Sequence, residues 1–110
     1  MPCPCLDTPQ RHECYAPVAF LGVDPTAGRY GEVALVRCAR CGQHWLRYAL
    51  ADEGFAESGR FFLGPIAPEV ARTLTPEGAV GYLESLDWYL YGGSYFRGQG
   101  RAPGGRLPLT

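Results

Sequence analysis

The sequence predicts a single α+β domain, built from an antiparallel sheet of about four strands and one C-terminal amphipathic helix. The chain has 110 residues, of which 46% are hydrophobic and 19% are charged, and this composition is typical of one compact domain. Four segments have the alternating or β-rich pattern of strands, and a helix-type apolar period follows them. We expect the domain to cover residues 1–97, whereas the Gly- and Pro-rich residues 98–110 read as a flexible tail.

The first two strands are expected at residues 14–23 and 29–38. The first segment is rich in aromatic and β-branched residues, and it stops at a turn signal formed by Asp24, Pro25 and Gly28. The second segment alternates apolar and polar positions, as a strand with one buried face does. The two strands therefore form a predicted hairpin.

The third and fourth strands are expected at residues 43–50 and 60–66. The third alternates again, and the fourth has the aromatic content of a strand and is stopped by Pro65. Between them, residues 51–59 hold three acids and two glycines and read as a loop. Four consecutive strands favour an antiparallel meander.

A helix is predicted to begin at Thr75, which would cap it, with Pro76 at its first position. Gly92 marks the latest end of this helix, so residues 88–91 are either its last turn or a break into an extended segment. Residues 68–74 have room for one or two helical turns of their own. The apolar side chains expected on one face of the main helix are Ala79, Leu83, Leu86 and Leu90.

All five cysteines lie in the first 41 residues, and their odd number argues against a fully paired disulfide framework. Cys38 and Cys41 are separated by two residues and followed by Gly42, which tolerates the positive φ of a tight turn. This spacing directs two thiolates at one tetrahedral ion. The segment resembles the knuckle of zinc-ribbon proteins, as found in small bacterial zinc-ribbon-like chains, and that resemblance implies a second pair of ligands elsewhere.

Three choices remain for this second pair. Cys3 and Cys5 come first, because a CxC pair chelates one ion and Pro4 restricts the segment before binding. Cys5 with Cys14 comes second, because Cys14 begins a strand that would lie beside the knuckle. His12 with Cys14 comes third, because alternate residues of an extended chain share a face.

Four thiolates would close the coordination sphere of the metal, so the expected cofactor is a structural zinc ion. Iron also binds four thiolates, and zinc is favoured as the commoner structural metal. No hydrolase, phosphate-loop or metalloprotease motif appears in the sequence. We therefore expect a protein that is not an enzyme.

The expected function is a zinc-stabilised protein-interaction module of the adaptor or inhibitor type, in which Tyr89, Tyr91 and Tyr95 bind a protein partner. A zinc ribbon that binds nucleic acid is the alternative, with Arg37, Arg40 and Arg47 around the knuckle and Trp45 as a stacking surface. The net charge of -1 does not favour nucleic acid. With no apolar run long enough to span a membrane, we expect a cytoplasmic protein without a membrane partner.

Overall fold

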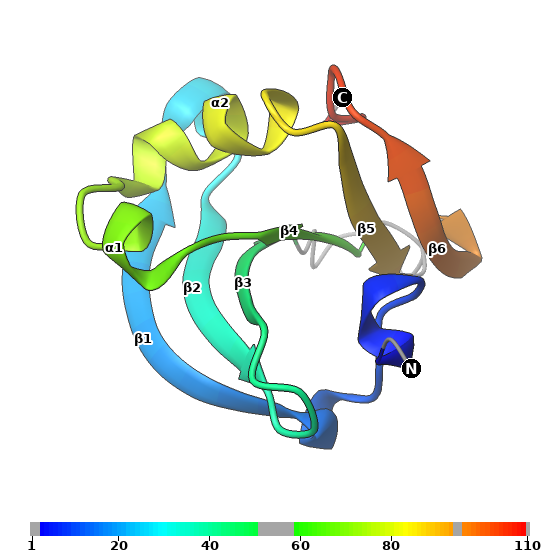
Figure 1. Ribbon diagram of the computed structural model, residues 1–110. Helices are drawn as coiled ribbons and strands as arrows, with labels where there is room; N and C mark the ends of the chain where they lie inside the picture. The colour runs from blue at the N-terminus through cyan, green and yellow to red at the C-terminus, as the bar shows by residue number, and fades with distance from the viewer. Residues whose placement is uncertain (1–2, 51–58, 94–95, 110) are drawn as a thin grey trace.

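The computed structural model describes residues 3–50, 59–93 and 96–109, which form a six-stranded antiparallel sheet. The strands follow one another in chain order across the sheet, from β1 at one edge to β6 at the other (Figure 1). Each strand therefore pairs with its neighbours in sequence, as in a meander. The strands are β1 (Tyr15–Asp24), β2 (Gly31–Cys38), β3 (His44–Leu50), β4 (Arg60–Pro65), β5 (Trp88–Gly93) and β6 (Gly98–Pro103).

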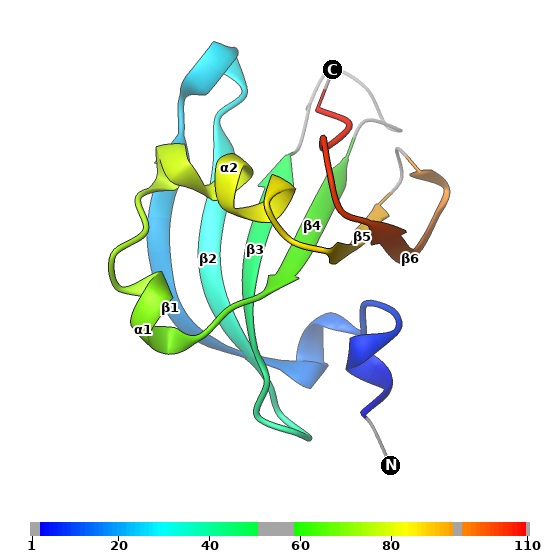
Figure 2. The same ribbon diagram turned by 45° about the horizontal axis from the view of Figure 1, so that its top comes forward.

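Two short helices connect β4 to β5 and lie on one face of the sheet (Figure 2). They are α1 (Pro68–Ala71) and α2 (Ala79–Glu84). Leu83 of α2 is fully buried against side chains of β2, β3 and β4, so this helix covers the main core. We call this core the helix-side core. Its buried side chains include Val33, Leu46, Tyr48, Phe62, Leu83 and Tyr89.

A second core lies on the opposite face of the sheet, where the N-terminal segment, residues 3–14, covers it. Adjacent residues of a strand point to opposite faces. Trp45, Leu63 and Leu90 accordingly pack here, while their chain neighbours Leu46, Phe62 and Tyr89 belong to the helix-side core. We call this second core the cysteine-side core. Its fully buried members are Cys5, Cys38, Trp45, Leu63 and Leu90.

The antiparallel meander is confirmed, but the predicted number of strands is too small and the predicted helix is too long. The helix ends at Glu84, and Trp88–Gly93 forms β5 instead of a last helical turn. The expected flexible tail also needs correction, because Gly98–Pro103 forms β6 and pairs with β5 along its whole length. Main-chain hydrogen bonds to β5 hold this Gly-rich segment as a strand, which its amino-acid composition does not predict.

Candidate metal centre

Cys38 and Cys41 lie in the tight turn between β2 and β3, as the sequence predicts. Cys38 is the last residue of β2, and its carbonyl oxygen accepts the N–H of Gly42 at 2.9 Å. Gly42 adopts a φ of +80°, a conformation in which glycine is not strained. The N–H of Cys38 in turn donates to the carbonyl of Gln43 at 2.9 Å. The turn is therefore fixed by its own backbone.

Cys5 lies on one turn of 3-10 helix, Pro4–Leu6, at the start of the N-terminal segment, and Cys3 is the residue that caps the start of this turn. Pro4 occupies the first position of this turn, and the N–H of Leu6 donates to the carbonyl of Cys3 at 3.1 Å. Proline suits that position because its fixed φ matches the helix and it has no N–H to satisfy. Local sequence thus brings both thiols of the CxC pair toward the knuckle.

The four thiols of Cys3, Cys5, Cys38 and Cys41 form one cluster, which we call the cysteine cluster. Their sulfur atoms all lie within 4.8 Å of one another. The Sγ atoms of Cys3 and Cys38 are 3.8 Å apart, and those of Cys5 and Cys41 are 3.4 Å apart. Sulfurs bound at about 2.3 Å to a tetrahedral zinc ion are about 3.8 Å from one another. All four cysteines are free thiols, so the arrangement suits a metal ion.

The cluster lies at the border between the cysteine-side core and solvent. Cys5 and Cys38 are 0% and 1% exposed, Cys3 is half-buried, and Cys41 is exposed. Trp45 is fully buried in the same core. Two of the four sulfur-bearing residues are thus shielded from water, while an ion would still reach the site from the side of Cys41.

The surroundings of Cys5 and Cys38 shift the pKa values of these two thiols in opposite directions. Burial, together with hydrogen bonds to the other thiols, raises the pKa of Cys5. Burial also acts to raise the pKa of Cys38, but the backbone N–H groups of Cys41 and Arg40 donate to its sulfur and lower that pKa to about 7. A thiolate at Cys38 is therefore accessible near neutral pH, and thiolates are the form that binds metal.

Cys14, the remaining cysteine among the predicted ligands, does not join the cluster. Cys14 lies outside the group of four, although its carbonyl oxygen accepts the N–H of Ala39 at 2.9 Å and so ties the start of β1 to the knuckle. The side chain of His12 is not among the parts that the structure describes. The first of the three ligand sets is thus the one whose four sulfurs come together.

Of the predicted partner-binding tyrosines, Tyr89 is buried and Tyr91 is half-buried. Tyr89 is 6% exposed and belongs to the helix-side core, which corrects its assignment to an exposed surface. Tyr91 is half-buried, and Tyr95 lies outside the described residues. Trp45 is fully buried, so it offers no stacking surface to nucleic acid, although Arg37 and Arg40 are exposed.

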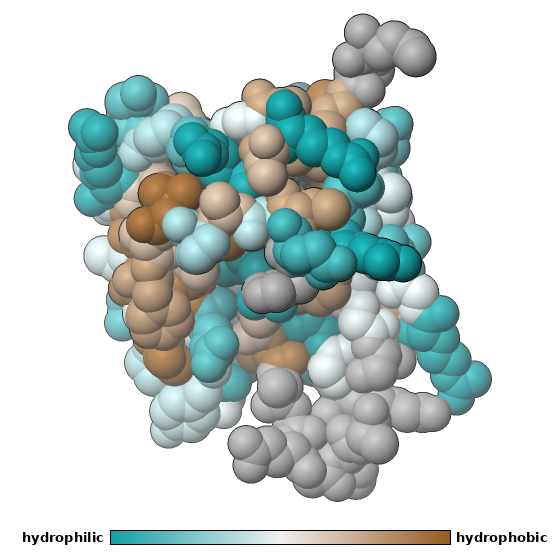
Figure 3. All heavy atoms as spheres, turned by 90° about the horizontal axis from the view of Figure 1, so that it is seen from below, coloured by the Kyte–Doolittle hydropathy of each residue, from teal (hydrophilic) through white to brown (hydrophobic). Residues whose placement is uncertain are grey.

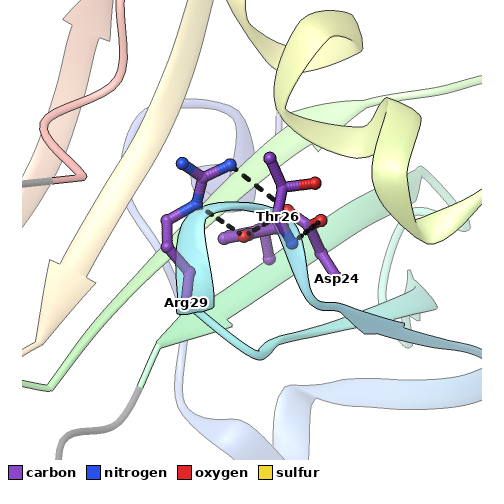
Figure 4. A network of polar contacts seen from close by, with 4 residues as sticks. Asp24, Thr26 and Arg29 are labelled. Carbon is purple, nitrogen blue, oxygen red and sulfur yellow. Dashed lines mark hydrogen bonds and ion pairs between the residues drawn. The ribbon is translucent and has the colours of Figure 1, made fainter.

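A buried polar network that the sequence analysis missed lies at the other end of β1 (Figure 4). The carboxylate of Asp24 is fully buried and accepts hydrogen bonds from the Tyr48 hydroxyl at 2.7 Å and the Thr26 N–H at 3.0 Å. Arg29 forms an ion pair with it at 3.4 Å. The sequence signal was the DPT turn, in which an Asp side chain commonly accepts a backbone hydrogen bond two residues on. The network closes the β1–β2 hairpin.

Among the described residues, none of the helices has the length and apolar character needed to cross a membrane. Comparisons of the chain with protein-family models, with curated proteins and with solved structures find no match.

Proposed function

We propose that this chain is a non-enzymatic zinc-binding module in which one structural zinc ion is held by Cys3, Cys5, Cys38 and Cys41. The observation that supports the proposal is the mutual approach of four free thiols to within 4.8 Å. Four thiolates complete a tetrahedral coordination sphere and leave no position for substrate or water, which is the arrangement of structural zinc sites.

The role of the ion is to attach the N-terminal segment to the sheet. Cys3 and Cys5 precede β1, whereas Cys38 and Cys41 lie between β2 and β3, so the metal closes a long loop of the chain. Besides the cluster, the polar contacts of the segment in the described part of the chain include bonds from β6 to the carbonyls of Leu6 and Pro9. A metal bound only by the folded chain stabilises that fold.

The surface that we propose for contact with a protein partner is β1, at the edge of the sheet. Val18 and Phe20 of this strand are 49% and 65% exposed, and Pro17 and Ala19 beside them are exposed as well. The space-filling view shows apolar surface on the side of the molecule where β1 lies (Figure 3). Two bulges bend β1, and they discourage the addition of another strand along it. A protein partner would therefore contact side chains here, and we propose that zinc stabilises the scaffold that presents them.

Metal analysis tests this proposal. Native mass spectrometry of the reduced protein should show one zinc ion per chain, and Cys38→Ser or Cys41→Ser should abolish its retention. Cys14→Ser is the matched control, because it removes a cysteine outside the cluster and should retain the metal. Reduced protein that binds no zinc, or a Cys14→Ser variant that loses it, would contradict the ligand set.

Replacement of zinc by Co²⁺ tests whether the coordination sphere is closed. We expect the absorption spectrum of tetrahedral cobalt with four thiolates, unchanged by added azide. A spectral shift on adding azide would show an exchangeable position, as in catalytic sites, and would overturn the structural role.

A further inference from the structure

A cavity of about 390 Å³ lies on the cysteine-side face of the sheet, next to but separate from the cysteine cluster. Its apolar wall comes from the sheet and includes Val36 of β2 and Phe61 of β4. Gln10, Tyr15 and Gln99 line it from the N-terminal side and from β6. The volume falls in the range of pockets that bind small molecules.

Arg47 of β3 is the only charged residue among the described residues that line this cavity. It is half-buried, and its guanidinium carbon lies 5.4 Å from the centre of the Phe61 ring. Within the described part of the chain it has neither an ion pair nor a hydrogen bond. The exposed Glu32 acts on it only at longer range, and burial lowers the pKa of Arg47.

A half-buried guanidinium without an anionic partner is unusual, because a desolvated charge is costly unless it is paired. Its five N–H donors form a planar fork that matches a carboxylate. Tyr15 adds a second donor, since its hydroxyl oxygen accepts the Gln10 N–H at 2.9 Å and its own proton has no acceptor among the described residues. The cavity thus combines an apolar wall with donors for an anion.

We propose that this cavity binds a carboxylate carried on an apolar group, in which the carboxylate pairs with Arg47 while the apolar group packs against Val36 and Phe61. The carboxylate belongs either to a free acid or to the C-terminal residue of a protein. Gln10 and Tyr15 follow the N-terminal 3-10 turn, which the cysteine cluster attaches to the sheet. The position of this part of the cavity wall therefore depends on the zinc site, so the inference rests on the proposed function.

Calorimetric titration of the protein as purified tests the proposal with two matched pairs of probes. One pair is 3-phenylpropanoate and 3-phenylpropanamide, and the other is N-acetyl-L-phenylalanine and its amide. We expect each acid to bind at least about tenfold more tightly than its amide. A hydrogen bond between charged groups contributes more binding free energy than one to a neutral group, and the difference corresponds to about this factor in affinity. Preference for the first acid would indicate a free acid, and preference for the second would indicate a protein C-terminus. Equal binding of acid and amide, or no binding, would overturn the proposal.

Two variants locate the site, and a third is the control. Arg47→Gln should reduce affinity for the acids about tenfold and leave affinity for the amides unchanged. Ala34→Phe should fill the cavity and reduce the binding of both. Arg37→Gln removes an exposed charge outside the cavity and should change neither. An Arg47→Gln variant that is folded and binds the acids normally would overturn the assignment.

Metal content, measured on the same samples, separates this proposal from the zinc site. Metal-free protein that still prefers the acids would contradict structural zinc and support the cavity. Zinc-loaded protein that fails to bind them would overturn the cavity assignment and leave the zinc site standing.

Discussion

Asp24 is a buried carboxylate whose charge is compensated by several donors. Burial acts to raise its pKa, but hydrogen bonds from Thr26, Tyr48 and Arg29 outweigh that effect and lower the pKa below its ordinary value. A carboxylate whose folded pKa is depressed stabilises the protein above the ordinary Asp pKa of about 3.9. This contribution is lost as the pH falls through the folded pKa.

We expect Asp24→Asn to destabilise the protein by about 1–3 kcal/mol at pH 7, because it removes a charged acceptor from buried donors. The difference from the unchanged protein should shrink as the pH falls below about 4. Urea unfolding at several pH values measures this difference. Asp87→Asn, at an exposed position, should cost almost nothing; an equal loss in both variants would contradict the role of the network.

Residue spacing predicted the cysteine cluster better than it predicted the aromatic surface. The CxxCG spacing encodes a local turn, and Pro4 restricts the CxC pair, so both halves of the cluster are local features. Tyr89 faces the core only because β5 pairs with β4, which is a long-range event. Burial of a single tyrosine depends on that pairing and could not be read from its neighbours in the sequence.

The segment from Ala79 to Gly93 carries two overlapping apolar periods. Ala79 and Leu83 fit a helix, and they are buried on α2. Beyond Glu84 the helical period also reaches Leu90, but Tyr89 and Leu90 lie in different cores and follow the two-residue period of a strand. Residues 88–93 form a strand and not a helix because they pair with β4 and β6. Their aromatic residues also favour a strand.

The edge strand β6 contributes more than main-chain pairing. The Gln99 side chain donates to the carbonyl of Pro9 at 2.9 Å, and Arg101 donates to that of Leu6 at 3.4 Å. The guanidinium of Arg101 also lies over the ring of Trp88, 3.9 Å from its centre. β6 thus holds the N-terminal segment beside the cysteine cluster. Composition alone could not predict this role, because the contacts join residues about 90 positions apart.

We expect Arg101→Gln to increase the rate of zinc release to a chelator about two- to fivefold, because it removes the charged donor to the Leu6 carbonyl, together with the cation–π contact to Trp88, and so loosens the N-terminal segment. The release is followed with a colorimetric zinc indicator at neutral pH. Arg106→Gln removes an exposed arginine beyond β6 and should leave the rate unchanged. Equal rates for the Arg101 variant and the unchanged protein would show that Arg101 does not hold the segment.

The whole molecule consists of one sheet between two cores of different origin. Among the residues whose side chains the structure describes, none of the N-terminal segment is buried in the helix-side core, whereas the cysteine-side core includes Cys5 and packs against Cys3 and Leu6. The first core depends on apolar burial within the meander and α2. The cysteine-side core depends on the N-terminal segment, which the cysteine cluster attaches to the sheet. Removal of the metal should therefore affect the two faces of the sheet unequally.

The two tryptophans of the chain make this difference measurable, because Trp45 and Trp88 both lie in the cysteine-side core, with ring centres 5.9 Å apart. Chelation of the zinc should shift tryptophan emission to longer wavelength as water enters this core. Far-UV circular dichroism should change little, because the helix-side core retains the strands. Re-addition of zinc should reverse the shift, and Cys14→Ser should behave as the unchanged protein. A simultaneous loss of both signals on chelation would instead mean that the two cores unfold as one unit.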